Sequence, residues 1–268
     1  MALRRFFDPE TGGDLRLELT PDPTPGDPAS FRLLRTFGYY DPSWDEPFIV
    51  PRDLESWRTD LVSVPSLFAW LVPKIGPHLP AAIVHDALVL GRGEAIAHDG
   101  PSVSREQADV ILRDAMGYLG TPVVRRWLMW AAVSLATCWH RRPRAYWRLV
   151  VILTVSIIIA LGALATLDLL DAWDVLPWMG EHVWYRELVG GAVFATLIPA
   201  VLSLLYGSLR RAFLLGGVAL AFLVHVTVAV AAVYAIYLAL ENVVTWLAER
   251  RGSSTKANLQ SDLAKGAL

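Results

Sequence analysis

Hydrophobic and polar positions are distributed very differently in the two halves of this chain. Three long segments of the second half carry no charged residue: 19 residues over 149–167, 22 over 188–209 and 29 over 212–240. A helix needs about 20 apolar residues to cross the hydrocarbon core of a bilayer. The pattern therefore predicts three transmembrane helices, at about 149–170, 188–209 and 212–240. They lie in a membrane domain over residues 147–248, which precedes a flexible tail over 249–268.

The first half alternates between short apolar segments and charged or turn-forming ones. Strands are predicted at Leu15–Leu19, Phe31–Tyr40 and Phe48–Val50, and helices at 66–71, 80–90, from Ser104 onward, and near 123–139. Ser104 and Gln107 have the spacing of a capping box, which marks the start of the clearest helix. We therefore expect an α+β fold. A small, mainly helical domain with a short N-terminal β-sheet occupies residues 1–146 and precedes the three-helix membrane region.

The distribution of charge supports this division. Residues 1–146 hold 18 of the 26 acidic and 16 of the 24 basic residues. The single cysteine, Cys138, excludes a disulfide framework and a cysteine-rich zinc module. A net charge of −2 gives no reason to expect a nucleic-acid partner.

Arginines flank the apolar segments asymmetrically, which predicts their orientation. Four arginines occupy residues 141–148 and two occupy 210–211, whereas residues 168–187 carry five acidic residues and one arginine. By the positive-inside rule, the N-terminal domain of this multi-pass protein faces the cytoplasm from the cell (inner or plasma) membrane. The first residues agree, since they lack the apolar core of a signal peptide. The lipid bilayer is the expected partner, and small residues at Gly190 and Gly216 suit packing between helices, including homo-oligomers.

Four ionisable side chains interrupt the apolar faces of two helices in the first domain. The segment 80–90 is apolar on all sides except at His85 and Asp86. In the following helix, Arg105 falls within the apolar stripe and Asp109 lies on its margin. Burying an unpaired charge costs several kcal/mol, so these groups need partners, and such departures from the local pattern concentrate at functional sites.

One interpretation of these residues is a metal-assisted hydrolytic site. Asp60, His85 and Asp109 would supply ligands to a divalent ion such as Zn²⁺, Mn²⁺ or Mg²⁺, which would lower the pKa of a bound water. The catalytic residues would be His85, Asp86 and Arg105, with Arg105 holding an anionic group of the substrate. Adjacent helical residues point about 100° apart, so His85 and Asp86 are not expected to bind the same ion.

The favoured interpretation is a buried ionic network without catalysis. In it Arg105 pairs with Asp109 and with Asp60 or Asp86, while His85 bonds a backbone carbonyl. A ligand-binding pocket is a third alternative. In the same domain, His98 and Asp99 are expected to be solvated in a loop.

Several short blocks in the same order resemble a known family. They are Thr59-Asp60, Ser63-Val64-Pro65, Ala81-Ala82, His85-Asp86, Ser104-Arg105, Ala108-Asp109 and Ala115-Met116. Together they are similar to the phage and bacterial domain of unknown function DUF1353, over a core of about residues 46–135. Val89 and Trp57-Arg58 depart from the family pattern, and membrane helices are not part of it. The resemblance implies a domain boundary and a shared polar set, and it brings no activity.

Two other enzyme families also contain an His-Asp pair on a helix. The HD phosphohydrolases need a more distant upstream histidine than His78, and secreted phospholipase A2, whose histidine is the base, needs many disulfides that a single cysteine excludes. Two function classes remain: a non-catalytic membrane protein of prophage type whose domain binds a partner, and a membrane-tethered metal-dependent hydrolase that uses His85, Asp86, Asp60 and Asp109.

Overall fold

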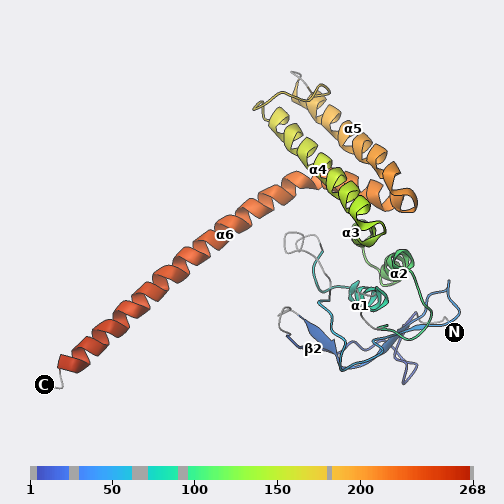
Figure 1. Cartoon of the computed structure of the whole chain (residues 1–268), viewed down its shortest axis with the longest axis horizontal. Helices are drawn as coiled ribbons and strands as arrows, with labels where there is room; N and C mark the ends of the chain where they lie inside the picture. The colour runs from blue at the N-terminus through green and yellow to red at the C-terminus, as the bar shows by residue number, and fades with distance from the viewer. Residues whose placement is uncertain (1–4, 24–29, 62–71, 90–95, 180–182, 266–268) are drawn as a thin grey trace. The chain divides into compact units, whose positions relative to one another are not determined.

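A computed structural model describes most of the chain. It covers residues 5–23, 30–61, 72–89, 96–179 and 183–265, with only the backbone described beyond Trp246 (Figure 1). The expected helix over 66–71 and the block Ser63-Val64-Pro65 lie outside the described residues. Contacts divide the chain into two compact units, Met1–Leu223 and Val224–Leu268. The first contains the candidate site.

Within the described residues, five short strands form two antiparallel sheets near the N-terminus. The three-stranded sheet has the order β1 (Phe6–Phe7), β4 (Phe37–Tyr39), β5 (Phe48–Val50), and the second pairs β2 (Leu19–Pro21) with β3 (Phe31–Leu33). Tyr39 lies opposite both Phe6 and Phe48, so aromatic side chains meet on neighbouring strands. The chain bends at residues 34–35, which divides the strand predicted over Phe31–Tyr40 into β3 and β4.

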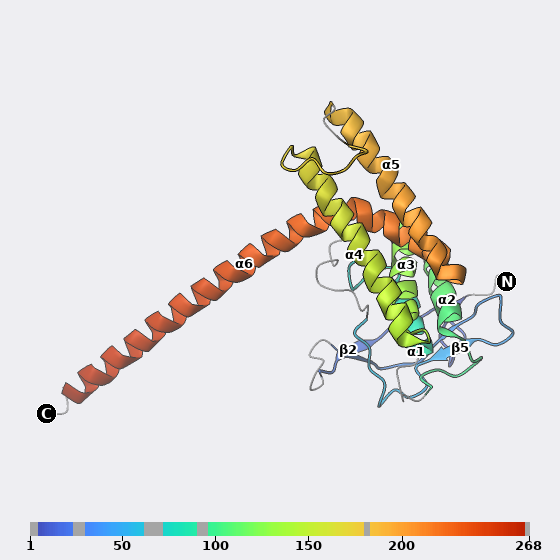
Figure 2. The same ribbon diagram turned by 45° about the horizontal axis from the view of Figure 1, so that its top comes forward.

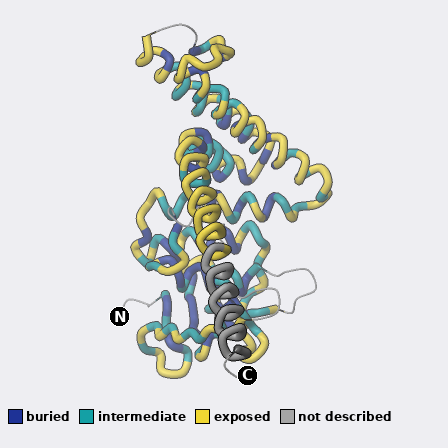
Figure 3. The backbone as a smooth tube through the Cα atoms, turned by 90° about the vertical axis from the view of Figure 1, so that its left-hand side faces the viewer, coloured by how far each residue is buried: buried dark blue, intermediate teal, exposed yellow. Residues whose placement is uncertain are grey.

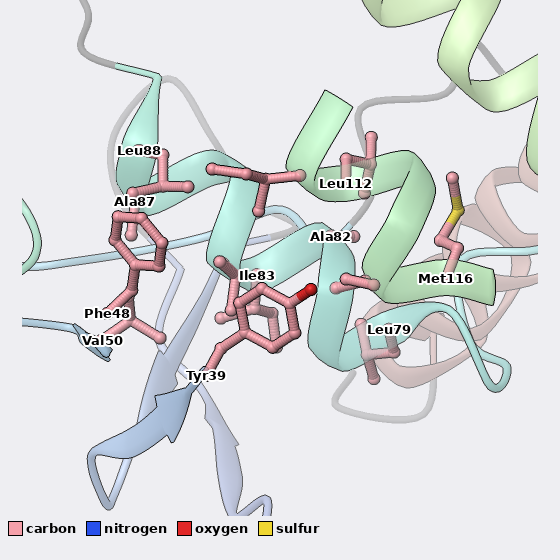
Figure 4. Packing of buried hydrophobic residues seen from close by; sticks show 14 of the residues in the cluster. Tyr39, Phe48, Val50, Leu79, Ala82, Ile83, Ala87, Leu88, Leu112 and Met116 are labelled. Atoms are coloured by element: carbon pink, nitrogen blue, oxygen red, sulfur yellow. The ribbon is translucent and has the colours of Figure 1, made fainter. Parts of the chain in front are cut away.

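Three helices complete the domain that carries the candidate site. They are α1 (Leu79–Leu88), α2 (Arg105–Tyr118) and α3 (Val123–His140). α1 packs against both β5 and α2, and α2 packs against α3. Tyr39 and Phe48 from the sheet meet Ile83 of α1 in the core, while Leu112 and Met116 of α2 lie on the far side of α1 (Figure 4). The expected combination of a small N-terminal strand region with helices is confirmed.

The second half of the chain is helical, with α4 (Arg144–Leu169), α5 (Trp184–Ser203), a 3-10 turn at Leu204–Leu209 and α6 (Arg210–Lys265). α4 packs against α3 and α5 (Figure 2). Among the described residues, two helical stretches are long and apolar enough to cross a membrane, by length and composition only: Arg144–Leu169 and Trp184–Trp246. The prediction of three separate spans is therefore wrong in its count.

The difference arises where the sequence pattern placed a loop between the second and third spans. Arg210 and Arg211 begin α6 directly after the 3-10 turn, so both predicted spans fall within one helical stretch. Its direction changes at Gly207, whose φ of 56° and ψ of −114° are not helical. α6 continues to Lys265, and the flexibility of residues 249–268 stays a prediction, as does the domain boundary at residue 146.

Many described residues of this helical half are exposed (Figure 3), and a large share of them are apolar. On α4 the exposed positions include Leu149, Ile152 and Leu153. In the second unit, every described side chain over 232–246 is exposed. Apolar surface on this scale is far more than soluble proteins normally leave uncovered.

Candidate functional site

His85 and Asp109 form a hydrogen-bonded pair across the interface between α1 and α2. His85 Nε2 lies 2.8 Å from Asp109 Oδ1, and the exposed fractions of the two side chains are 12% and 1%. A carboxylate accepts hydrogen bonds, so Nε2 carries the proton and Nδ1 of the neutral ring has a free lone pair. No described residue bonds Nδ1. The pair therefore fixes the tautomer of the imidazole.

The helices position this pair through burial and capping. α1 is buried on nearly every side, and His85 lies in its last turn. α2 starts at the predicted capping box: Gln107 N donates to Ser104 Oγ at 3.2 Å, and Ser104 N donates to Gln107 Oε1 at 2.8 Å. The box satisfies two backbone groups and fixes where the helix begins. Asp109 thereby faces α1 beside the buried Ala108 and Leu112.

Asp86 bonds a different element from its neighbour His85. Thr59 Oγ1 donates to Asp86 Oδ2 at 2.8 Å and accepts from the backbone N–H of Leu61 at 2.9 Å. Backbone hydrogen bonds of 2.8 and 3.0 Å to Phe31 hold Thr59 in place. His85 and Asp86 thus bond different elements, and the prediction that they do not bind the same ion stays a prediction, whereas the role of Thr59 was missed. Its only signal in the sequence was its place in the Thr59-Asp60 block.

Burial changes the acidity of Asp86. The pKa of its carboxyl is raised to about 6, mainly by loss of solvent and to a smaller extent by the negative charge of Asp60. The charge of His85 and the hydrogen bond from Thr59 act in the opposite direction. Asp86 thus exchanges protons closer to neutral pH than an ordinary aspartate.

The backbone beside this carboxyl is strained. Leu61 is buried and has a φ of 72°, in the left-handed region that a branched apolar residue rarely adopts. Such a conformation costs about 1–3 kcal/mol and persists only where the surroundings impose it. The conformation fixes the turn that carries Thr59 and Asp60.

Asp60 and Arg105 complete the predicted site residues. Both are half-buried, and Asp60 lies close enough to Asp86 to affect its pKa. The favoured network paired Asp109 with Arg105 and His85 with a backbone carbonyl. His85 bonds the carboxylate of Asp109 and not a backbone carbonyl, because α1 brings the imidazole directly against it. The pairing of Arg105 with Asp109 stays a prediction.

The described residues contain no group of three or more His, Cys, Asp or Glu side chains arranged to hold a metal ion. Asp109 lies behind His85 and bonds the nitrogen opposite Nδ1, as carboxylates do behind metal-binding histidines. Its second oxygen, Oδ2, is buried and has no hydrogen-bond partner among the described residues. A metal held by Asp60, His85 and Asp109 stays a prediction, and the geometry suits Asp109 better as an outer partner than as a ligand.

His98 is buried, contrary to the expectation that it is solvated. Its Nδ1 lies 3.2 Å from the carbonyl oxygen of Ala87, and its Nε2 lies 3.1 Å from that of Pro101. Asp99 pairs through its backbone with Ile49, which draws this segment against the sheet and removes His98 from solvent. Both ring nitrogens of His98 are engaged, so it cannot replace His85 as a base.

A protein family matches the domain that carries the candidate site. A family model described as a protein of unknown function (DUF1353) matches residues 31–133, which contain every candidate site residue. The match supports the domain resemblance and begins earlier than the expected core, at β3. No curated protein and no solved structure matches the chain.

Proposed function

We propose that the domain at residues 31–133 is a membrane-tethered hydrolase in which His85 acts as the general base. The observation that carries the proposal is the 2.8 Å bond between His85 Nε2 and the buried Asp109. A histidine whose one nitrogen bonds a carboxylate accepts a proton at the other, and the carboxylate stabilises the imidazolium that forms. Asp109 is then a positioning residue.

The reaction would be hydrolysis of an acyl or phosphoryl ester. A water molecule loses its proton to His85 Nδ1 as its oxygen attacks the carbonyl carbon or phosphorus. The bond to the leaving oxygen breaks, and Asp86 supplies a proton to that oxygen because its pKa of about 6 keeps a fraction protonated near neutrality. Arg105, at the start of α2, would hold an anionic group of the substrate.

The apolar helices support a membrane tether. α4 and the stretch Trp184–Trp246 have the length and composition of spans, and most of their side chains are exposed. We infer that they anchor a cytoplasmic N-terminal domain to the cell membrane, with more than one crossing. The arginines before α4 and the acidic residues after it favour this orientation.

Contacts of α2 favour a substrate at the level of the lipid headgroups. Glu106 accepts a hydrogen bond from Ser208 of the 3-10 turn at 3.2 Å and lies 3.3 Å from Arg141, just before α4. Asp109 follows Glu106 by three residues, about 4.5 Å along the helix axis. The His85–Asp109 pair thus lies at the end of the domain that adjoins α4.

The test is hydrolysis of p-nitrophenyl acyl esters and p-nitrophenyl phosphate by the full chain in detergent micelles. His85→Gln should lower kcat/KM by about 10²–10⁴-fold, the contribution of a general base. Asp109→Asn should also lower it, since an amide no longer selects the tautomer. His140→Gln is the matched control, because that histidine is exposed and bonds only the carbonyl of Ala136 among the described residues. Equal rates in wild type and His85→Gln would refute a general base.

A metal-assisted version of the same site has a separate readout. In it Nδ1 of His85 binds a divalent ion, and Asp109 is the outer partner of the ligand. Metal content of the purified chain should then approach one ion per chain and fall in His85→Gln at unchanged melting temperature. Hydrolysis that resists chelators, with no bound metal, favours the metal-free base.

The second candidate function is a non-catalytic, prophage-type domain that binds a partner protein. One observation favours it: the bond between the half-buried His85 and the buried Asp109 also joins α1 to α2. In that case His85→Gln should change stability while no ester is hydrolysed by either chain.

A further inference from the structure

Six residues at the junction of α3 and α4 form a surface that the hydrolytic site does not use. They are Trp139, Arg141, Arg142, Arg144, Trp147 and Arg148, and we call them the Arg–Trp collar. We propose that the collar binds the anionic headgroups of membrane phospholipids. The proposal goes beyond hydrolysis and does not depend on it.

Cation–π contacts organise the collar. The guanidinium carbon of Arg141 lies 4.9 Å from the ring centre of Trp147, and that of Arg148 lies 5.3 Å from the ring centre of Trp139. Each contact joins the end of α3 to the start of α4. A guanidinium stacked on a ring loses rotational freedom but keeps N–H donors at its edge, where they can bind a phosphate.

The positive charge of the collar is largely uncompensated. From Asp114 to Asp168 the sequence contains six arginines and no acidic residue between these two aspartates. Among the described residues only Arg141 has a carboxylate partner, Glu106 at 3.3 Å, whereas Arg142, Arg144 and Arg148 have none. Arg142 and Arg148 are also exposed. Three of the four guanidinium groups therefore remain available for an anion.

The collar ends where the exposed apolar face of α4 begins. Leu149 directly follows Arg148, and Leu149, Ile152 and Leu153 are each about half exposed, at 55%, 49% and 52%. Tryptophan and arginine side chains with an apolar surface on one side are typical of the headgroup layer of a bilayer. This continuity favours a lipid headgroup over a free phosphate or a nucleic acid as the occupant.

Native mass spectrometry of the full chain in detergent tests the proposal, with phosphatidylglycerol and phosphatidylcholine of identical acyl chains supplied at equal concentration. Each arginine near an anionic lipid surface favours binding by about fivefold, the equivalent of about 1 kcal/mol. The chain should retain more phosphatidylglycerol, and Arg142→Gln with Arg148→Gln should reduce that preference by about 25-fold. Replacing both by Lys should preserve most of it.

Arg113→Gln is the matched control. Arg113 also stacks on tryptophans, 5.2 Å from the ring centres of Trp127 and Trp130, but its charge is paired with Asp114 at 2.8 Å. Its loss should leave the lipid preference unchanged. Equal retention of both lipids by the wild type, or an unchanged preference in the double Gln variant, would overturn the proposal. So would displacement of the lipid by glycerol phosphate or by a single-stranded oligonucleotide at the same concentration, which would assign the collar to another anion.

Discussion

The interface between α1 and α2 and the junction of α3 and α4 treat charge in opposite ways. In the first, ionisable side chains are largely withdrawn from solvent at an apolar interface and bond a specific neighbour, as His85 bonds Asp109. In the second, arginines stay near solvent, stacked on ring faces and mostly without carboxylates. A buried group is held in one fixed geometry, which suits a residue that takes part in catalysis. An exposed cation on a ring adapts to its anion, which suits recognition of a surface.

Removing one charged side chain from each of the two regions should change the free energy of unfolding by very different amounts. Asp109→Ala leaves His85 facing an apolar gap, and we expect the domain to lose about 2–4 kcal/mol of unfolding free energy. Arg148→Gln at the junction should change it by less than about 0.5 kcal/mol. Chemical denaturation followed by circular dichroism measures both.

Asp114→Ala is the control on the same helix as Asp109. Its carboxylate bonds only the side chain of Arg113 among the described residues and is exposed, so the expected loss is again below about 0.5 kcal/mol. If Asp109→Ala were as mild as Asp114→Ala, the buried pair would not hold α1 to α2, and the contrast between the two regions would fail.

The sequence predicted the members of the buried pair better than their partnership. His85 and Asp109 stood out because each interrupts an apolar helical face, a property of one segment alone. Which residues meet across two helices depends on how the helices pack, and no local pattern contains that information. Arg105, one turn before Asp109 on the same helix, was therefore named as its partner, and the bond from His85 on the neighbouring helix was not foreseen.

The same limit explains the other differences. The burial of His98 depends on the pairing of Asp99 with β5, a contact between segments about 50 residues apart in the chain. The count of spans failed for a local reason, since an arginine pair marks a loop in most membrane proteins but begins a helix here. The capping box at Ser104 was confirmed because both of its residues lie within one turn.

The stability of the domain should depend on pH through the carboxyl of Asp86, which lies next to His85. Asp86 has an ordinary pKa of 3.8 when unfolded and about 6 when folded, so the folded state binds its proton more tightly. Protonation of Asp86 therefore adds at most about 3 kcal/mol to the free energy of unfolding. This contribution is fully present below about pH 4 and is lost as the pH rises through 6. Asp86→Asn, which resembles the protonated acid, should exceed wild type in stability at pH 7 and match it at pH 4.

Asp53→Asn provides the control for that titration. Asp53 is exposed, and hydrogen bonds from Ser56 and from the backbone of Glu55 lower its pKa, which is the opposite direction. Its replacement should bring no gain at pH 7. A constant difference between Asp86→Asn and wild type from pH 4 to 7 would show that Asp86 does not titrate in this range.

The smallest expected effect concerns how the helix start positions the buried pair. Ser104→Ala removes the hydroxyl that accepts from Gln107 N and should cost about 1 kcal/mol of unfolding free energy. Ser104→Asp retains an acceptor and should recover most of that loss. The capping box lies at the end of α2 that carries Asp109, so fraying there loosens the carboxylate behind His85. It also loosens Glu106, the partner of Arg141, but leaves in place Arg142 and Arg148, which have no carboxylate partner among the described residues. Ser104→Ala should therefore lower ester hydrolysis more than it lowers phosphatidylglycerol retention. Equal losses of both would mean that the α1–α2 interface and the collar respond as one structure, and the contrast between them would have to be abandoned.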